Sequence, residues 1–591
     1  MNTAFPKLKP DEFRALDWAR THAFSGQRAF ASALGFSLGK ANAMLRCFSA
    51  DGWLAPDHSL TAAGLAQLAP HKVDNAVIMA AGMSSRFAPL SYEKPKGVLK
   101  VKGEILIERQ IRQLHEAGIR DITVVVGYMK EQFFYLQEKF GVALVVNEDY
   151  HRFNNPSSLF RVRDRLRNTY VCSSDNYFSE NVFEPYVYRA YYAASFFPGP
   201  SQEWGLVADS RGRIVGIDHS PVDRWCMMGH AYFDRDFSAR FVRLLEDEYA
   251  SPLTRQNLWE ALFERHLDVL SMDIRRYPGG VIHEFDSLEE LRAFDSRYLG
   301  ETDSAIFSNI CSVLRCKESD IDRIEVLKQG LTNLSFKFSV GGRSYVYRHP
   351  GFGTESWISR ASEAFSLAAA KKLGLDPTVI HIDPVAGWKL SSFIENARPL
   401  DCRNPDDLRS AARLMRRLHD ARIPSPHAIG LWDRIGSFVR QTTAAHKNFP
   451  DYAALHDRMA SLHARWHRES PPPVLCHGDC RAANFLAAPD GSVVLLDWEC
   501  SAAFDPGFDI GTFICCSDFS PAEAESFLAL YHGRPPAPAE LRHDFASIAL
   551  AAWYWFVWSV FQESIGNPAG RDTLNLYRMA KTWLERALPE K

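Results

Sequence analysis

The segment that decides the fold of the C-terminal half reads His477-Gly478-Asp479-Cys480-Arg481-Ala482-Ala483-Asn484, and Val493-Val494-Leu495-Leu496-Asp497-Trp498-Glu499 follows it. An Asp two residues after a His, an Asn five residues later and another Asp after a short apolar strand are the parts that phosphoryl transfer from ATP requires. Asp479 would accept the proton of a substrate hydroxyl group, while Asn484 and Asp497 would hold Mg²⁺ on the ATP phosphates. The alternative is a loop beside an unrelated buried strand.

Further parts of a nucleotide site occur upstream in the expected order, which disfavours that alternative. The stretch Gly330-Leu331-Thr332-Asn333-Leu334-Ser335-Phe336 lies between two predicted strands, as a loop that covers phosphates would. Gly330 and Asn333 are therefore predicted to bind nucleotide. Arg348 ends the next predicted strand, and Glu363 lies on the following predicted helix, where an ion-pair partner belongs.

Together with Gly351-x-Gly353-Thr354-Glu355 and Asp505-Pro506-Gly507-Phe508-Asp509, these residues resemble the choline/ethanolamine kinase family over roughly residues 320 to 588. The resemblance implies that Asp479 is the catalytic base, that the Asn and Asp named above bind metal, and that Arg348 with Glu363 positions ATP. It also implies that the two aspartates of the second stretch brace the catalytic loop. An Arg at position 348, where protein kinases have Lys, departs from that wider group.

The predicted substrate pocket of this half depends on aromatic residues near the C-terminus. Trp555 and Trp558 are three residues apart and share one face of a predicted helix, and Tyr577 lies on the next helical stretch. A quaternary ammonium donates no hydrogen bond, so aromatic faces are the available means of holding choline, at about 0.5 to 2 kcal/mol per contact. The resemblance places the choline pocket of the family on these aromatics. The alternative is a stripe of side chains that pack in the core.

Residues 73–300 show a different pattern, in which strands, a glycine-containing turn and helices alternate. Apolar runs predict strands at 77–80 and 122–127, and amphipathic periodicity predicts a helix at 105–117 between them. Such alternation implies a parallel sheet with crossover helices, in which ligands bind at the carboxyl ends of the strands.

The turn after the first of these strands, Met79-Ala80-Ala81-Gly82-Met83-Ser84-Ser85-Arg86-Phe87-Ala88-Pro89-Leu90, is followed by Lys94-Pro95-Lys96. Small residues here let backbone N–H groups close on a nucleotide, so Ala80, Ala81 and Gly82 are predicted nucleotide-binding residues. Arg86 and Lys96 place two cations where a triphosphate would lie. The run is neither a Walker A loop nor a dinucleotide fingerprint. The alternative is a turn with a surface Arg and Lys.

This run resembles the nucleoside-triphosphate transferase superfamily, and within it the bacterial phosphocholine cytidylyltransferases, over about residues 74 to 298. Further matches are Asn154-Asn155 before Ser158-Leu159, Ser174-Asp175-Asn176-Tyr177 and Ile282-His283-Glu284-Phe285-Asp286. The resemblance implies that Asp175 and Asp286 hold Mg²⁺, and that Gly82, Arg86 and Lys96 bind CTP. Read in isolation, Asp175 fits a turn and Asp286 a helix N-cap. Ser84 stands where the family has glycine, so a positive φ there would cost strain.

The chemistry of cytidylyl transfer supports this set of residues. A phosphomonoester has a second pKa of about 6 and is largely dianionic at neutral pH, so its attack on an α-phosphorus needs no protein base. Charge neutralisation is what the reaction needs, and two carboxylates holding Mg²⁺, together with Lys96 and Arg86, supply it. Lys96 and Arg86 are therefore predicted catalytic residues.

Residues 1–72 read as helix, turn, helix and hairpin, which resembles a winged helix-turn-helix. Its predicted recognition helix offers only Lys40, Asn42 and Arg46 as donors for reading a groove in DNA. We therefore keep two readings of this segment, a DNA-binding domain and a protein-contact module.

Length and composition set limits on the whole chain. With 591 residues, 46% hydrophobic and 24% charged, the chain is globular and multidomain. Its net charge of -3 gives no overall field that would gather nucleic acid or anionic lipid. The 11 cysteines are odd in number and form no C-x-x-C pairs, and no apolar signal segment opens the chain, so we expect a cytoplasmic protein. The apolar run 545–561 is shorter than the roughly 20 residues that span a bilayer, so a buried helix is expected and no membrane span.

These observations predict three domains. We expect a small α+β winged helix-turn-helix-like domain at 1–72, an α/β Rossmann-like nucleotidyltransferase domain at 73–300 and an α+β bilobal kinase-like phosphotransferase domain at 301–591. The chain would phosphorylate choline with ATP and then transfer CMP from CTP to phosphocholine, giving CDP-choline and pyrophosphate. Mg²⁺ would serve both sites.

Other functions stay open. The same reactions could act on ethanolamine, and the transferase half could act on 2-aminoethylphosphonate, because a primary ammonium can also use carboxylate and carbonyl partners. A metabolite-sensing DNA-binding regulator is an alternative of another class. An aminoglycoside-type phosphotransferase is disfavoured, since polycationic sugars call for an acid-lined cleft and the 545–561 run has no carboxylate. The oligomeric state is not predicted.

Overall fold

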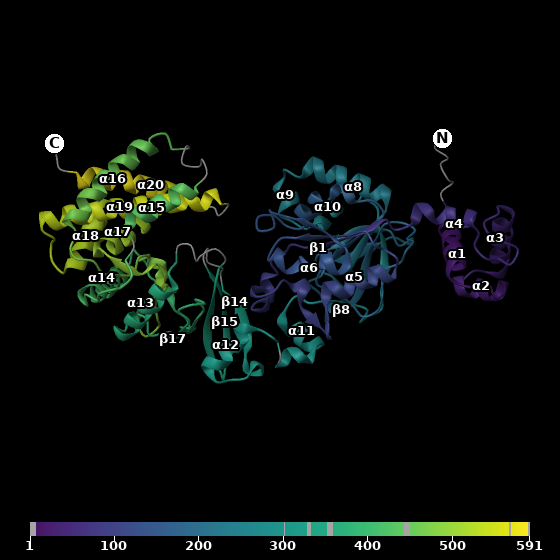
Figure 1. The fold of residues 1–591 in the computed structure, drawn as a ribbon, viewed down its shortest axis with the longest axis horizontal. Coiled ribbons are helices and arrows are strands. Elements are labelled where there is room, and N and C mark those ends of the chain that lie inside the picture. Colours follow the sequence, from purple (N-terminus) through teal and green to yellow (C-terminus); the bar gives the residue numbers. More distant parts are fainter. Residues whose placement is uncertain are drawn as a thin grey trace. The chain divides into compact units, whose positions relative to one another are not determined.

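The computed structural model describes residues 8–300, 302–327, 333–351, 358–428, 430–442, 449–565 and 569–588. These residues form two compact units, one ending at Ser304 and the other beginning at Ala305 (Figure 1). The first unit contains both the N-terminal helices and the strand–helix region, so the segments predicted as separate domains at 1–72 and 73–300 pack into one body. All eleven cysteines are free.

The first unit opens with a group of small helices. Its members are α1 (Pro10–Thr21), α2 (Gln27–Leu34), α3 (Leu38–Ala50) and α4 (Ala62–Leu68). Side chains of Ser37 and Thr61 cap α3 and α4, and Gly35 ends α2 in the left-handed region at φ 68°. Leu54 and Leu60 form an antiparallel bridge where the hairpin is predicted. Helices and the bridged turn thus occur in this segment, and the winged-helix assignment stays a prediction.

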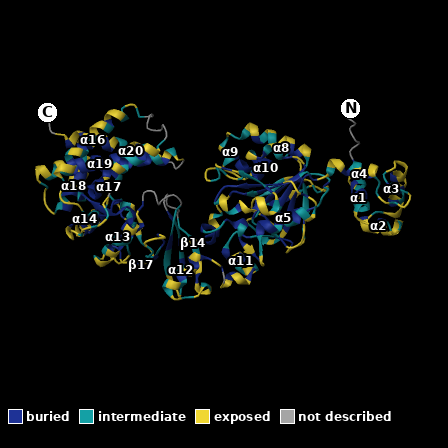
Figure 2. Cartoon of the chain, viewed as in Figure 1, coloured by how far each residue is buried: buried dark blue, intermediate teal, exposed yellow. Residues whose placement is uncertain are grey.

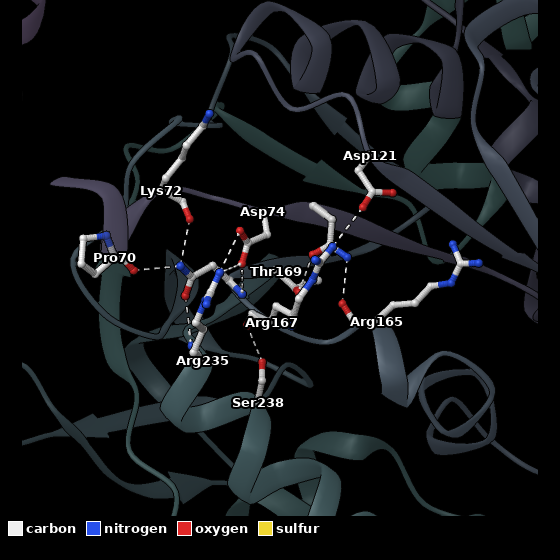
Figure 3. A network of polar contacts seen from close by, with 11 residues as sticks. Pro70, Lys72, Asp74, Asp121, Arg165, Arg167, Thr169, Arg235 and Ser238 are labelled. Carbon is white, nitrogen blue, oxygen red and sulfur yellow. Dashed lines mark hydrogen bonds and ion pairs between the residues drawn. The ribbon is translucent and has the colours of Figure 1, made fainter. Parts of the chain in front are cut away.

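Polar contacts fix the chain where it leaves these helices and enters the sheet. The buried side-chain amide of Asn168 donates to the carbonyl oxygens of Pro70 (2.9 Å) and Lys72 (2.8 Å). Its oxygen accepts from the backbone N–H of Arg235 at 3.0 Å, and the Arg235 guanidinium pairs with Asp74 at 2.9 Å. Figure 3 shows this network converging on the start of the first strand. The loop before β6, which contains Asn168, therefore fixes the chain segment that leads into the first strand of the sheet.

Nine strands of the described residues form one mixed sheet in this unit. They are β1 (Asn75–Ala80), β4 (Ile122–Val126), β5 (Ala143–Val146), β6 (Thr169–Ser173), β8 (Tyr191–Pro200), β9 (Gly205–Ala208), β10 (Ile214–Asp218), β11 (Val222–Phe233) and β12 (Asp273–Arg276). Strand β1 pairs in parallel with β4 and β6, and β5 extends β4 in parallel. The helix α5 (Leu106–Glu116) makes the crossover from β1 to β4, which confirms the predicted strand–helix–strand order. The carboxyl ends of β1 and β6 therefore meet at one edge of a Rossmann-like sheet.

Further helices and one short strand pair complete the first unit. The helices are α6 (Tyr135–Phe140), α7 (Pro156–Arg161), α8 (Arg235–Glu248), α9 (Pro252–Arg255), α10 (Trp259–Arg265) and α11 (Leu288–Phe294). Separate hydrophobic clusters contain alternate residues of the central strands, so both faces of the sheet are covered. Strand β7 (Asn176–Phe178) pairs antiparallel with β13 (Ile282–Glu284).

The second unit begins with α12 (Ala305–Leu314) and a small antiparallel sheet. The strand order is β14 (Asp322–Val326), β15 (Asn333–Val340), β16 (Arg343–Pro350), β18 (Lys389–Ser392) and β17 (Val379–Ile382). Helix α13 (Arg360–Lys372) follows β16 in sequence. The strands predicted on either side of the 330–336 stretch are thus present, and they pair antiparallel.

Helices make up most of the remaining second unit. They are α14 (Pro405–Asp420), α15 (Leu431–Gln441), α16 (Tyr452–Glu469), α17 (Pro506–Cys516), α18 (Pro521–His532), α19 (Pro538–Ser564) and α20 (Arg571–Ala587). Two hairpin-like pairs frame the catalytic segment, β20 (Val474–Cys476) with β23 (Ala502–Phe504) and β21 (Phe485–Ala487) with β22 (Val493–Leu495).

Helix α19 is the apolar element of this unit. By length and composition it could cross a membrane, but 89% of its most apolar window is buried inside the protein. It packs against α17 and α20, and Figure 2 shows buried residues along it, whereas outer helices such as α8 and α9 carry many exposed residues. The prediction of a buried helix is confirmed.

Candidate active sites

The first candidate site lies where β1 ends. Ala80, Ala81 and Gly82 line a cavity of about 570 Å³, together with Lys96 and Asp175. The backbone of this turn exposes its N–H groups because its side chains are small. The predicted turn residues and two of the predicted charged residues therefore share one cavity.

The residue two positions after Gly82 adopts a left-handed backbone conformation. Ser84 lies in the left-handed region, with φ 48° and ψ 44°. A residue with a Cβ atom is strained there, whereas glycine is not. The expected cost of serine at this position is therefore present in the structure.

Two carboxylates converge on Lys96, and one of them also contacts Arg86. The Lys96 ammonium lies 3.0 Å from an Asp175 carboxylate oxygen and 3.8 Å from Asp286, and the Arg86 guanidinium lies 3.4 Å from the other Asp286 oxygen. The Lys96 side chain is only 9% exposed. Burial lowers the pKa of Lys96, but the charge and hydrogen bond of Asp175, together with the charges of Glu284 and Asp286, outweigh burial and raise the pKa, so the ammonium stays charged.

The β7–β13 pair explains how Asp175 and Asp286 meet. Asn176 lies opposite Glu284 in the register, so the turn before β7 and the chain after β13 lie at the same end of the pair. Ser287, and not Asp286, caps α11 through its side chain. Asp286 is therefore available for ligands, and two carboxylates that already share one cation fit a divalent metal ion.

Two further carboxylates near this site escaped the sequence analysis. Burial, with the nearby Asp175 charge, raises the pKa of the Glu284 carboxyl to about 8, and its oxygen accepts from the Asn176 side chain at 3.1 Å. Burial and the Asp286 charge raise the pKa of Glu203 as well. The only sequence signal for Glu284 was its place inside the 282–286 motif.

The second candidate site is built on the catalytic loop that the sequence analysis identified. The backbone N–H groups of His477 and Gly478 each donate to Asp509 at 2.7 Å, and His419 contacts its carboxylate at 3.0 Å. The loop is therefore held by a buried carboxylate. Asp505 caps α17 by accepting from the backbone of Gly507. Asp509 thus contacts the loop directly, whereas Asp505 contacts α17 and His543 and its bracing of the loop stays a prediction.

Asp479, Asn484 and Asp497 line one cavity of about 460 Å³. The Asn484 amide donates to an Asp479 carboxylate oxygen at 3.1 Å, so the predicted base and one predicted metal ligand are neighbours. Asp497 adopts a left-handed conformation, with φ 67°, at the end of β22. Carboxylate and amide oxygens on one wall are the donors that suit Mg²⁺.

The predicted nucleotide residues form a buried charged network. The Arg348 guanidinium contacts both carboxylate oxygens of Glu363, one of them at 2.8 Å, and a carboxylate oxygen of Glu499 at 3.8 Å. Burial would raise the pKa of Glu363, but Arg348 outweighs burial and lowers it. Asn333 donates to Glu499 at 2.6 Å. Glu499 is thus a further member that sequence reasoning missed, and Gly330 lies outside the described residues.

Two of the three aromatic residues predicted to bind choline line the same cavity as the predicted base. Trp555 and Trp558 line the cavity with Asp479, with ring centroids 5.6 Å apart and planes inclined by 80°. Tyr577 does not lie among the lining residues: its ring packs against Phe449 and Phe556. The structure therefore does not bring Tyr577 to this cavity, because α20 turns that side chain toward a different part of the core.

Other charged residues that sequence reasoning missed also line this cavity. Asp518 and Asp572 contribute carboxylates from the chain after α17 and from α20. The expectation that the cleft has no acidic lining was wrong, because it was based on the 545–561 run alone. Arg481, inside the catalytic motif itself, lies over the Trp555 ring.

The donors predicted for DNA recognition are only partly available. The Lys40 ammonium pairs with Asp11 and lies 4.6 Å from the Phe36 ring centroid. Asn42 and Arg46 lie on the same helix, α3. The charge of Lys40 is thus shared with Asp11, whereas Arg46 is exposed on the same helix.

Comparison with known proteins assigns both halves. Residues 76–172 match a MobA-like NTP transferase domain, and residues 323–543 match the phosphotransferase enzyme family. A 2-aminoethylphosphonate cytidylyltransferase of Lancefieldella rimae is 38% identical over 229 residues, which is 38% of this chain and 93% of that protein. A choline-phosphate cytidylyltransferase of Streptococcus pneumoniae is 33% identical and covers 37% of this chain and 96% of its own length.

A crystal structure of the choline kinase LicA from Streptococcus pneumoniae is 25% identical, covers 49% of this chain and 100% of its own, and superposes with a TM-score of 0.42. The two matched regions follow one another along the chain without overlap. The chain therefore belongs to the family of cytidylyltransferases that contains the 2-aminoethylphosphonate and choline-phosphate enzymes, and it joins such a domain to a domain that matches the phosphotransferase enzyme family.

Proposed function

We propose that the second unit transfers the γ-phosphoryl group of ATP to choline, and that the first unit then joins phosphocholine to CTP, giving CDP-choline and pyrophosphate. The observation that carries this proposal is the cavity in which Asp479 faces two perpendicular indole rings. A base beside aromatic walls suits an alcohol with a quaternary ammonium head. The product of that step has the chemistry that a choline-phosphate cytidylyltransferase uses.

In the kinase site the chain supplies a base, an orienting surface and a nucleotide contact. Asp479 accepts the hydroxyl proton at a carboxylate oxygen, while Trp555 and Trp558 orient the cationic head so that the hydroxyl faces this oxygen. Arg348, held by Glu363, positions the ATP phosphates.

In the transferase site the chain supplies charge and no base. Lys96 and Arg86 neutralise charge on the triphosphate as the phosphate of the substrate attacks and pyrophosphate leaves. Asp175 and Asp286 would hold Mg²⁺ here and Asn484 and Asp497 would hold it in the kinase site, where the ion neutralises phosphate charge when bound.

The test is a reaction of the purified full chain with choline, ATP, CTP and Mg²⁺, followed by phosphorus NMR. Asp479→Ala should stop formation of phosphocholine only, and added phosphocholine should restore the CDP product. Asp175→Ala should stop formation of the CDP product only. The exposed aspartates Asp490 and Asp209, changed to Ala, serve as matched controls. Loss of both steps by either site variant, in a folded chain, would contradict this division of labour.

A second candidate substrate concerns the transferase half alone. The relative that is 38% identical is named for 2-aminoethylphosphonate, a phosphonate whose primary ammonium can bind carboxylates. Glu284 and Glu203 are extra carboxylates near this site. A higher kcat/KM for 2-aminoethylphosphonate than for phosphocholine, with CTP, would favour this candidate over the first.

For residues 1–72 we infer a protein-contact module, with a winged helix as its proposed fold. The engagement of Lys40 by Asp11 supports this choice over DNA binding. Fluorescence anisotropy with a labelled DNA duplex at low salt tests it, because a DNA-binding domain would show strongly salt-dependent binding. We also propose a cytoplasmic location, in keeping with eleven free thiols.

A further inference from the structure

Arg481 occupies an unusual place in the kinase cavity. Its guanidinium carbon lies 4.6 Å from the ring centroid of Trp555 and 5.9 Å from that of Trp558. The same side chain donates from Nε to one Asp479 carboxylate oxygen at 2.7 Å and lies 3.4 Å from the other oxygen. One cation therefore touches both the predicted base and the two aromatic walls.

The walls are held firmly, whereas the arginine is the more exposed partner. Trp555 donates from its ring nitrogen to Thr512 at 3.1 Å, and both indoles are less than 10% exposed. The Arg481 side chain is 37% exposed, against 11% for Asp479. A ligand that enters the corner between the two indoles can thus displace the arginine more readily than it can move the rings.

These contacts are the ones that a cationic alcohol needs. Its hydroxyl group must reach Asp479, and a quaternary head must lie on the indole faces, because it has no N–H to donate. Two cations in one corner also repel each other. A primary ammonium has further choices, since Asp572 and Asp518, which also pairs with Arg578, are among the residues that line the same cavity.

We propose that Arg481 is a specificity-determining residue that competes with quaternary ammonium groups for the faces of Trp555 and Trp558. In the ligand-free cavity it stands in for the cationic head of the substrate. Choline must displace it, whereas a primary ammonium alcohol can bind beside it on the carboxylates. This inference rests on the proposed function of the second unit, namely phosphorylation of a cationic alcohol.

The experiment uses the full chain with Arg481→Gln and Arg481→Met, which remove the charge but keep most of the side-chain length. Tetramethylammonium is the binding probe, because it has no hydroxyl group and cannot be phosphorylated. Calorimetric titration should show that both variants bind it roughly tenfold more tightly than the wild type. The KM for choline should fall by about the same factor, and the KM for ethanolamine by less than about threefold. KM and affinity are the quantities to compare, because loss of the Asp479 contact is also expected to lower kcat.

Arg403→Gln is the matched control, since Arg403 pairs with Glu523 on the surface and does not line the cavity. Unchanged or weaker binding of tetramethylammonium by both Arg481 variants would overturn the inference, and choline turnover by the wild type would still uphold the proposed function. If the wild type phosphorylates neither alcohol, the proposed function fails, while the titration still decides whether Arg481 blocks the indoles. A variant that lowers both KM values equally would also overturn the claim about specificity.

Discussion

The two candidate sites of this chain neutralise their charges in different ways. In the transferase site Lys96 lies between Asp175 and Asp286, so a cation predicted to bind phosphates is paired with carboxylates predicted to bind metal. In the kinase site there are two separate ion pairs. Arg348, predicted to position ATP, is buried with Glu363, and Asp479, the predicted base, pairs with Arg481 beside the two tryptophans. When ligands bind to the transferase site, Lys96, Asp175 and Asp286 should therefore all exchange their present ion-pair partners for ligand groups. In the kinase site only the Asp479–Arg481 pair should do so.

Buried carboxylates away from the reacting groups show a second contrast. Asp509 of the kinase unit is fully buried, yet His419 and two backbone N–H groups outweigh burial and lower its pKa. In Glu260 of the transferase unit, burial outweighs the hydrogen bonds of Tyr192 and Asn155 and raises the pKa to about 7. The first unit thus contains a carboxyl that prefers to be neutral, and the second contains one that prefers to be charged.

The largest expected effect tests the charge exchange in the transferase site. Lys96→Ala should slow cytidylyl transfer by about 10³-fold, because it removes a buried cation that neutralises the transferred phosphates. Phosphorylation of choline should not change. Lys94→Ala is the control, since this nearby lysine is 43% exposed and pairs with Asp303. Product formation followed by phosphorus NMR gives both rates, and an equal loss in the control would break the comparison.

The next effect concerns Glu260, whose oxygen accepts from the Tyr192 hydroxyl at 2.9 Å. Its raised pKa means that the folded state holds a proton that the unfolded state has lost, so this contribution to stability is complete below about pH 4.5 and is lost as the pH rises through about 7. Glu260→Gln should therefore raise the free energy of unfolding by about 2 kcal/mol at pH 8.5 and by almost nothing near pH 4.5.

Scanning calorimetry against pH measures this difference, with the kinase unit in the same chain as an internal reference. Glu264→Gln is the matched control, because Glu264 lies on the same helix, α10, but pairs with His219 at the surface. A stabilisation of Glu260→Gln that is equal at both pH values would show that the carboxyl is not neutral in the fold.

A third prediction concerns the aromatic residues of the kinase cavity. Trp558→Leu should raise the KM for choline about tenfold, because it removes one aromatic face from the cavity. Tyr577→Leu should leave that KM unchanged, since its ring packs outside the cavity. Steady-state kinetics at saturating ATP give both values. An equal rise in the two variants would restore Tyr577 to the substrate site.

The smallest expected effect lies in the turn after β1. Ser84→Gly should raise the free energy of unfolding of the first unit by about 0.5 kcal/mol, because relief of the left-handed strain slightly exceeds the entropy cost of glycine. Ser85→Gly should lower it by about 0.5 kcal/mol, since Ser85 begins a short 3₁₀ helix and has no such strain. Chemical denaturation measures both, and the same sign for the two variants would contradict the account of this turn.

Much of each site could be predicted because its reactive residues occur in short sequence motifs. The spacing from Asp479 to Asn484, the small residues 80–82 and the strand ending at Arg348 each depend on backbone within a few residues, where local hydrogen bonding decides the structure. The positive φ of Ser84 was suggested only by the resemblance, because the family has glycine at this position. Trp555 and Trp558 share a face because a single helix fixes their relative phase.

What the sequence alone determined about this protein is therefore the order of its elements and the reactive groups that each one carries. Tertiary structure decided which groups meet: the β7–β13 register joins Asp175 to Asp286, the rotation of α20 against α19 keeps Tyr577 out of the cavity, and Arg481 lies across the indoles. Packing between elements distant in sequence fixes these relations, and helical or strand periodicity contains no information about the rotation of one element against another.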